Sequence, residues 1–176
     1  WSPDGTHIAY VRYEPPAGAD GPPAASSIQV LDLATMTSVE AVRSVQPELV
    51  DVPRWSGDGT RLVFGIDIFD DQFNEIGSTI GVSTIGGEVQ RLNDPTMFSY
   101  APDWSAATDE IVFSVEGLRF RSDPEAPPTA WNLWVAKPDG SGVRQLTDVA
   151  DGQHLFQPAW VGDGSTLLAT LETAGD

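Results

Sequence analysis

The sequence predicts an all-β fold built from consecutive four-stranded antiparallel blades, the arrangement found in β-propellers. Three observations predict it. A phrase centred on tryptophan recurs at intervals of 54, 49 and 56 residues along the 176-residue chain. Two further phrases recur between the tryptophans, always in the same order. No stretch shows the helical apolar period, with start and stop signals, that is typical of an α-helix.

The first phrase consists of a tryptophan, a tight polar turn and an apolar strand. The blade tryptophans are Trp1, Trp55, Trp104 and Trp160. Three copies of the turn end in Asp-Gly, and their glycines are Gly5, Gly59 and Gly164. We expect these glycines to take the positive φ of a hairpin turn. We expect the tryptophans to pack between blades, since one copy per blade at a fixed register suits a core; a ligand-stacking cage is the alternative.

The second and third phrases are short runs of alternating apolar and polar residues. The second covers 28–35, 80–87 and 133–140, and the third covers 39–43, 89–93 and 143–147. Such alternation indicates half-buried strands. Each repeat therefore has four strands. Strand A ends at the tryptophan, strand B is the apolar run after the turn, and strands C and D are the second and third phrases.

The sequence motifs of these repeats resemble those of a known family. Two stretches are similar to the WD40-like repeat of the TolB β-propeller family: PRWSGDGTRLVF (53–64) and LWVAKPDGSGVRQLT (133–147). The usual pattern of that repeat is Pro-x-Trp-Ser-Pro-Asp-Gly, a strand, Ile-Tyr-Val-x-Asp and then Arg-x-Leu-Thr. The resemblance spans essentially the whole chain. It implies a six-bladed ring and an extracytoplasmic location, periplasmic or secreted. Its motif residues are structural, so it leaves the function open.

The strand count predicts an incomplete ring. Residues 1–176 hold strands B, C and D of a first blade, two complete blades, and strands A and B of a fourth. Closed propellers have about four to eight blades. We therefore expect about three and a half blades, an arc of a larger ring, with the missing blades in the remainder of a parent protein or in a partner. Such an arc exposes unpaired strand edges.

The composition excludes several classes of partner. The chain has 26 acidic and 9 basic residues, a formal net charge of −17, and no cysteine. Nucleic-acid binding needs a basic footprint, and anionic membranes repel acidic surfaces, so neither partner is expected. No apolar run approaches the length of about 20 residues that spans a bilayer. The absence of cysteine excludes disulfides and thiolate chemistry.

Three inserts between strands B and C lengthen the repeats: 13–27, 67–79 and 116–130. In an up-and-down blade the B–C and D–A connections emerge on one side, here named the insert-bearing face. These connections carry fourteen acids: Glu14, Asp20, Glu48, Asp51, Asp67, Asp70, Asp71, Glu75, Asp94, Glu116, Asp123, Glu125, Asp148 and Asp151. The opposing bases are few, chiefly Arg119 and Arg121. We expect a protein or peptide partner to bind this face; the alternative is acidity spread evenly over the surface for solubility.

The second insert contains the best metal candidates. Asp67, Asp70, Asp71, Asn74 and Glu75 offer the hard oxygen ligands that calcium prefers. Their spacing is not that of an EF-hand loop. The alternative is a solvated acidic loop held down by Phe69 and Phe73. Calcium is the sole cofactor that the sequence suggests.

Three functional hypotheses remain open. The first is a non-enzymatic interaction or scaffold module that uses the insert-bearing face. The second is an accessory propeller of a secreted hydrolase of the prolyl oligopeptidase type, with its catalytic domain elsewhere. The third is a calcium- or carbohydrate-binding propeller. No catalytic residue is predicted, because a Gly-x-Ser-x-Gly nucleophile elbow is absent and the two histidines, His7 and His154, are interpreted as ordinary surface or turn residues.

Overall fold

The computed structural model describes residues 1–16, 22–116, 130–162 and 164–173, which form two complete blades between two partial ones. Blade 1 contains β1 (His7–Glu14), β2 (Ala25–Asp32) and β3 (Thr37–Val45). Blade 2 contains β4 (Glu48–Trp55), β5 (Arg61–Phe69), β6 (Glu75–Thr84) and β7 (Gln90–Arg91). A 3-10 turn, η1 (Pro95–Met97), leads to blade 3, with β8 (Ser99–Trp104), β9 (Ile111–Glu116), β10 (Trp131–Ala136) and β11 (Arg144–Gln145). Blade 4 contains β12 (Gln153–Val161) and β13 (Thr166–Thr173).

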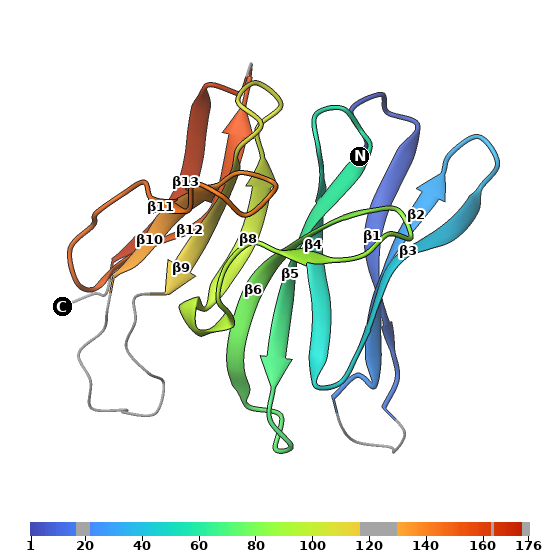
Figure 1. Ribbon diagram of the computed structural model, residues 1–176, viewed down its shortest axis with the longest axis horizontal. Coiled ribbons are helices and arrows are strands. Elements are labelled where there is room, and N and C mark those ends of the chain that lie inside the picture. The colour runs from blue at the N-terminus through green and yellow to red at the C-terminus, as the bar shows by residue number, and fades with distance from the viewer. Residues whose placement is uncertain (17–21, 117–129, 163, 174–176) are drawn as a thin grey trace.

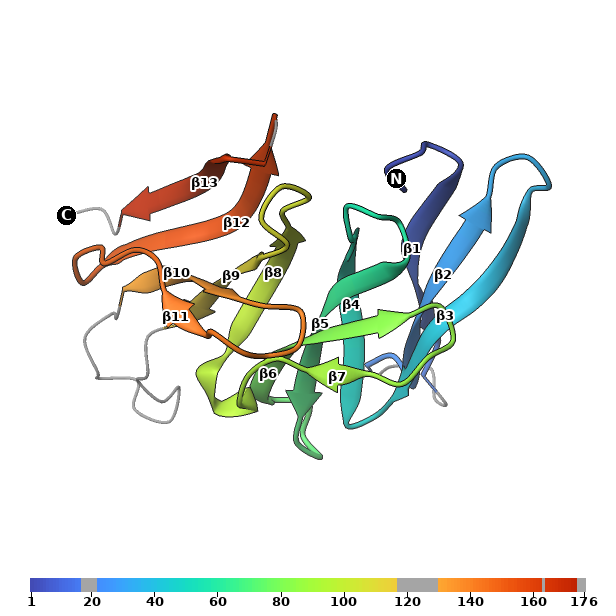
Figure 2. The ribbon, with the colours of Figure 1, turned by 45° about the horizontal axis from the view of Figure 1, so that its top comes forward.

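The blades stand side by side in chain order (Figure 1). Neighbouring strands within each blade pair antiparallel, and Figure 2 brings the short outer strands β7 and β11 into view. One parallel pair, Trp131 with His154, links blade 3 to blade 4. The predicted fold class is confirmed, since strands A to D occur where the repeats place them and the chain forms an arc. No helix among the described residues is long and apolar enough to cross a membrane.

The turn between strands A and B is held by side chains of the motif itself. In the first copy Asp4 accepts hydrogen bonds through one oxygen, Oδ1, from the Ser2 hydroxyl and from the backbone and hydroxyl of Thr6. The second copy repeats all three bonds around Asp58. The glycine that follows has φ of +71° in both copies, and Gly164 has φ of +78°. The repeated Ser, Asp, Gly and Thr therefore have a structural role.

The repeated proline marks a β-bulge in each strand A. The register of β4, β8 and β12 shifts at the residue before the proline and at the proline itself. The residue before the proline has positive φ in all three strands: Val52 (40°), Ala101 (49°) and Gln157 (48°). Proline lacks an N–H group and is tolerated where the ladder is interrupted. In a regular strand, residues an odd number of positions apart point to opposite faces. The bulge adds one residue, so Val50 and Trp55 point to the same face and pack in one cluster.

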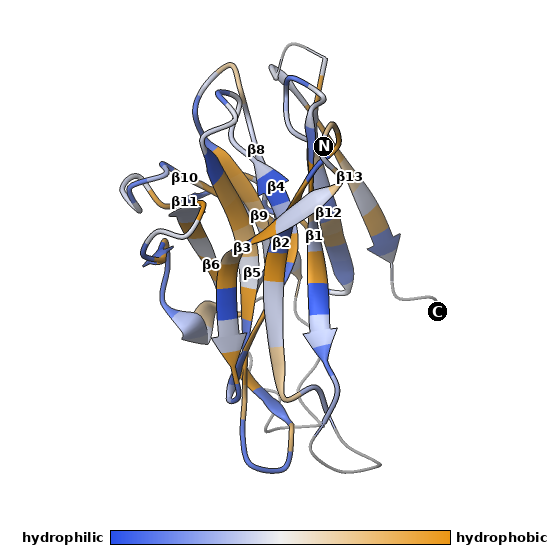
Figure 3. Ribbon diagram, turned by 90° about the vertical axis from the view of Figure 1, so that its right-hand side faces the viewer, coloured by the Kyte–Doolittle hydropathy of each residue, from blue (hydrophilic) through white to orange (hydrophobic). Residues whose placement is uncertain are grey.

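Apolar clusters fill the interfaces between successive blades. The first, between blades 1 and 2, is centred on Phe64, and the second, between blades 2 and 3, on Phe113; both side chains are fully buried. The third, between blades 3 and 4, includes Leu133. Figure 3 shows the hydrophobic residues along the strands that face one another. Burial of this apolar surface is the main source of stability.

The four tryptophans differ in burial. Trp104 is 5% exposed and belongs to the second cluster, whereas Trp55 and Trp160 are half-buried against the first and third clusters. Each packs toward the blade before its own. Trp1 is 74% exposed, and no described residue covers that side of blade 1. That Trp1 packs between blades therefore stays a prediction.

The second insert extends a hairpin instead of forming a long loop. Strand β5 continues to Phe69, which pairs with Glu75 at the start of β6. Only 70–74 connect the two strands. Asp70 closes this turn by accepting a hydrogen bond from the backbone N–H of Asn74 at 2.8 Å. The insert therefore lengthens the blade and carries its side chains on ordered strands.

Candidate functional site

The insert-bearing face forms as predicted at the described strand ends. The hairpin ends of β1–β2, β5–β6 and β9–β10 point to one side in Figure 1, and the turns between strands A and B point to the opposite side. Five charged residues predicted for this face lie outside the described residues: Asp20, Arg119, Arg121, Asp123 and Glu125. The strand ends therefore define the face in the part of the chain that the structure describes.

Among the described acids of this face, Asp51 has the most strongly raised pKa. It lies in β4 opposite Gly65 of β5. A Cβ atom at Gly65 would stand 2.2 Å from Asp51 Oδ1, so only glycine leaves room for this carboxylate. Burial, together with the nearby Glu75 carboxylate, raises the pKa of Asp51 to about 6. Among the described residues Asp51 forms no ion pair.

Two tyrosines surround the carboxylates. The Tyr100 hydroxyl of β8 donates a hydrogen bond to Glu75 Oε1 of β6 at 2.5 Å, which links blades 2 and 3. Burial raises the pKa of Tyr13, and the charges of Asp51 and Asp67 raise it further. Asp51, Asp67 and Glu75 are named the acidic cluster from here on. The cluster draws on β4, β5 and β6 and is approached by aromatic hydroxyls from blades 1 and 3.

An aromatic group continues the cluster toward blade 4. Trp131 stacks on Tyr100, with ring centroids 5.3 Å apart, and meets Phe156 edge-on at 4.8 Å. His154 stacks on Phe156 at 5.9 Å, and its Nδ1 is buried without a hydrogen-bond partner among the described residues. The prediction that His154 is an ordinary surface residue is therefore wrong. It sits in an aromatic contact that spans two blades.

Sequence reasoning missed the tyrosines and Phe156, although the repeat contains a signal for two of them. Asp51, Tyr100 and Phe156 each stand four positions before a blade tryptophan, directly before the bulge. Strands β4 and β8 are the end strands of their sheets, and β12 lies between β13 and β10. The residue before the bulge therefore recurs at one place in successive blades. Aligning the repeats on this position brings the three residues together.

Part of the predicted acidity is neutralised. Arg43 forms a two-pronged ion pair with Glu14, and Arg91 binds both carboxylate oxygens of Glu48 at 2.6 and 2.7 Å. Both arginines come from strands D, which the sequence analysis did not count among the opposing bases. The pairing lowers the pKa of Glu14. Two of the fourteen predicted acids, Glu14 and Glu48, are therefore paired with arginines of the same chain.

The structure does not gather the predicted metal ligands around one point. Asp70 accepts hydrogen bonds from the Asn74 side chain as well as its backbone, and Glu75 accepts one from Tyr100. Phe69 and Phe73 stack at 4.2 Å, as in the alternative reading of this loop. No group of three or more His, Cys, Asp or Glu side chains that could hold a metal ion occurs among the described residues. The geometry gives calcium no preformed cage.

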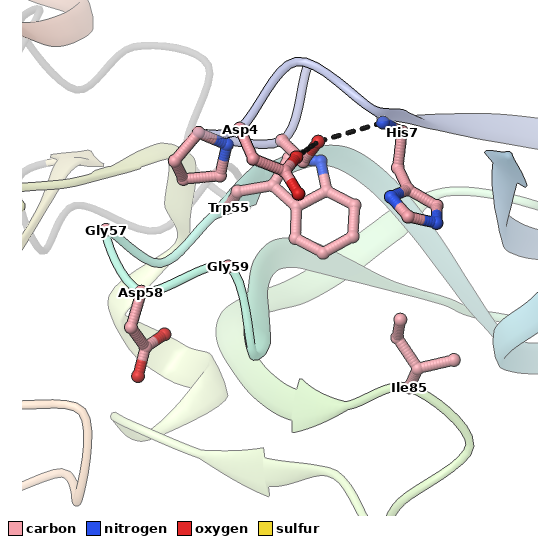
Figure 4. Close-up of a pocket in the computed structure, with 9 residues that line it drawn as sticks. Asp4, His7, Trp55, Gly57, Asp58, Gly59 and Ile85 are labelled. Atoms are coloured by element: carbon pink, nitrogen blue, oxygen red, sulfur yellow. Dashed lines mark hydrogen bonds between the residues drawn. The ribbon is translucent and has the colours of Figure 1, made fainter. Parts of the chain in front are cut away.

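A pocket of about 480 Å³ lies on the opposite side, between blades 1 and 2. Figure 4 shows the Trp55 ring in its middle, with Asp4, Asp58, His7 and Ile85 around it. The pKa of each of the two carboxyls is lowered to about 2, chiefly by the serine hydroxyl of its own turn, so both are ionised at neutral pH. The pocket thus combines an aromatic ring with two negative charges.

Comparisons with known proteins identify the fold. No protein-family model and no curated protein sequence matches the chain. A solved structure described as TolB from Agrobacterium tumefaciens is 20% identical, with a TM-score of 0.68, over all of this chain and 57% of that one. TolB from Acinetobacter baumannii is 17% identical, with a TM-score of 0.71, over all of this chain and 37% of that one.

A peptidase structure shows the same architecture. Acylaminoacyl peptidase from Pyrococcus horikoshii is 23% identical, with a TM-score of 0.56, over 84% of this chain and 24% of that one. The chain thus spans less than two thirds of each of these proteins. Likeness at this level of identity concerns the arrangement of strands. The chain has a TolB-like β-propeller fold, of which it forms an arc of blades.

Proposed function

We propose that the chain is a non-enzymatic interaction module, working outside the cytoplasm, whose insert-bearing face holds a basic segment of a protein partner. The observation that carries this proposal is the position of Asp51 opposite Gly65, near the Glu75 carboxylate that Tyr100 holds across the blade interface, where burial raises the pKa of Asp51 to about 6. A carboxyl in this state is ionised at neutral pH at a cost in free energy. A cationic side chain placed beside it reverses that cost.

The surroundings of the acidic cluster suit a lysine or arginine side chain. The Tyr100 and Trp131 rings, stacked at 5.3 Å, offer an aromatic surface for an aliphatic stem and for a cation–π contact. The Tyr100 hydroxyl holds Glu75 in place from the next blade. The chain's net charge of −17 steers basic partners toward it over longer distances. Binding is therefore expected to strengthen as pH rises through about 6 and to weaken with salt.

A titration of the full chain tests the proposal. The probe is an acetylated, amidated peptide of alternating lysine and glycine, followed by calorimetry at pH 7.5 in 20 mM and 500 mM salt. The Asp51→Asn/Glu75→Gln variant should bind at least about tenfold more weakly at low salt, the loss of one charge-assisted contact. The control is Asp32→Asn/Asp139→Asn, which removes two charges from turns on the opposite side.

The two variants separate a site from general acidity. Equal weakening by both would attribute the binding to net charge and would contradict the proposal. Unchanged binding by the first variant would contradict it as well. A parallel titration with calcium chloride tests the metal hypothesis. A calcium affinity that Asp51→Asn/Glu75→Gln abolishes would make the cluster a cation site and would also overturn the peptide proposal.

A further inference from the structure

The interface between blades 2 and 3 contains an arginine site built from the chain's own residues. The Arg61 guanidinium lies over the Trp104 ring, 4.6 Å from its centroid. Asp109 accepts a hydrogen bond from Trp104 Nε1 at 2.8 Å and lies 3.8 Å from the Arg61 guanidinium. Ring, cation and carboxylate thus form one closed group.

The interface between blades 1 and 2 has the corresponding tryptophan, Trp55, but no arginine at the position that corresponds to Arg61. His7 begins β1 as Arg61 begins β5, and each stands six positions after the tryptophan of its own blade. The His7 ring reaches only to 6.4 Å from the Trp55 ring, tilted by 51°. The pocket of about 480 Å³ lies beside the Trp55 ring, where its counterpart has a guanidinium. Trp55 Nε1 is buried with no hydrogen-bond partner among the described residues.

Thr60 takes the position of Asp109 at this interface, and the pocket has two other carboxylates, those of Asp4 and Asp58. Among the described residues, the hydrogen bonds that Asp4 and Asp58 accept all go to Oδ1, so each Oδ2 is available to a ligand. The turns fix both carboxylates, so little side-chain entropy is lost on binding. Pro3 and Ile85 add apolar walls against which an aliphatic stem can pack. The described lining contains no lysine or arginine.

We propose that this pocket binds the guanidinium group of an arginine side chain from a protein or peptide partner, over the Trp55 ring and between Asp4 and Asp58. The occupied interface around Trp104 is the template for the bound geometry. The pocket is lined by residues of two A–B turns, which point away from the insert-bearing face (Figure 1). This site is therefore independent of the proposed function, and its variants leave the acidic cluster intact.

Nuclear magnetic resonance of the full chain gives a separate signal for each indole N–H group. The probes are acetyl-Gly-Xaa-Gly-amide peptides in which Xaa is arginine, lysine or citrulline, the last a neutral analogue of arginine. The arginine peptide should shift the assigned Trp55 Nε1 signal and leave the Trp104 signal unchanged. Citrulline should produce no saturable shift, and lysine should bind more weakly, since only guanidinium is planar and forked.

Two variants test the contacts. Asp58→Asn keeps an Oδ1 acceptor for the turn and should weaken arginine binding about tenfold, whereas Asp139→Asn, in another blade's turn, should not. His7→Arg supplies an internal guanidinium and should abolish peptide binding. Equal response to arginine and citrulline, full binding to His7→Arg, or an absent shift at Trp55 would each overturn the proposal. His7→Arg should place a guanidinium over Trp55 as Arg61 lies over Trp104. A folded His7→Arg variant that still binds the arginine peptide would therefore contradict the proposal.

Discussion

The interfaces around Trp55 and Trp104 use one motif and reach different degrees of closure. Around Trp104 the ring is 5% exposed, its N–H group is paired with Asp109, and Arg61 covers its face. Around Trp55 the ring is half-buried, its N–H group is unpaired among the described residues, and a pocket remains. The tryptophan sets the place of the contact. Residues six positions after the preceding tryptophan and in the following turn decide whether the interface closes.

The third interface supports this interpretation. Trp160 also has a buried Nε1 without a partner among the described residues, beside a pocket of about 350 Å³. The position of Arg61 is taken in blade 3 by Glu110, which binds Arg144 and approaches Lys137 instead. A carboxylate cannot make a cation–π contact. Closure around Trp104 therefore depends on the particular pair Arg61 and Asp109.

The largest expected difference is in the cost of removing each ring. Trp104→Ala should lower the free energy of unfolding by about 3–5 kcal/mol, because a fully buried aromatic leaves a cavity. Trp55→Ala should cost roughly half as much, since half-buried surroundings already contact solvent. Urea denaturation followed by circular dichroism measures both. Equal losses would show that the two interfaces contribute equally despite their different burial.

The other end of the interface between blades 2 and 3 should respond to pH. Burial raises the pKa of Asp51 from an ordinary 3.8 to about 6, so the folded state holds the proton more tightly than the unfolded chain between these values. The free energy of unfolding should therefore fall as pH rises from about 4 to 6, and Asp51→Asn should recover on the order of 2 kcal/mol at pH 7.5. Thermal melts at pH 4.5 and 7.5 measure it. A variant that shows the same pH slope would contradict the assignment to Asp51.

Close packing at the turns gives a smaller effect. A Cβ atom at Gly57 would stand 2.4 Å from the Ala106 Cβ of blade 3. Gly57→Ala should destabilise the chain by about 1–2 kcal/mol through overpacking. The double variant Gly57→Ala/Ala106→Gly should recover only part of that loss, because the Cα of residue 106 would still stand 2.7 Å from the new Cβ atom. A double variant as unstable as the sum of its parts would mean that the two residues do not share the contact.

The smallest expected change in stability comes from a substitution that makes the Trp104 interface resemble the Trp55 interface. Arg61→His should cost about 0.5–1 kcal/mol by removing the cation–π contact with Trp104. It should also make the Trp104 indole signal respond to the arginine peptide, as the proposed Trp55 site does. If Arg61→His loses stability but its Trp104 signal does not respond to the peptide, removal of Arg61 alone does not create an arginine site over Trp104.

The sequence predicts the blades because their signals are local. Alternation and Asp-Gly turns lie within single repeats, the tryptophans mark where each repeat recurs, and the strands appear where these patterns put them. The bulges were not predicted. Positive φ at Val52 or Gln157 is unfavourable for such residues in isolation and is imposed by the pairing of strand A with strand B.

The candidate site was predicted only in part. The common side of the inserts and the acids Asp51, Asp67 and Glu75 follow from strand order, which the repeats determine. The contact of Tyr100 with Glu75 and the stacking of Trp131 join different blades, and their side-chain geometry is not present in any single repeat. The ion pairs of Arg43 and Arg91 were missed for the same reason.

The bulge before each repeated proline also has a consequence for recombination between blades. It is the one place where strand A changes the face that its side chains present, and Val52, Ala101 and Gln157 mark it in three blades. A crossover there keeps both halves in phase with their neighbours, whereas deletion of the bulged residue would turn every residue before it to the wrong face. The prolines therefore define natural junctions at which segments of different propellers of this kind can be exchanged without loss of register.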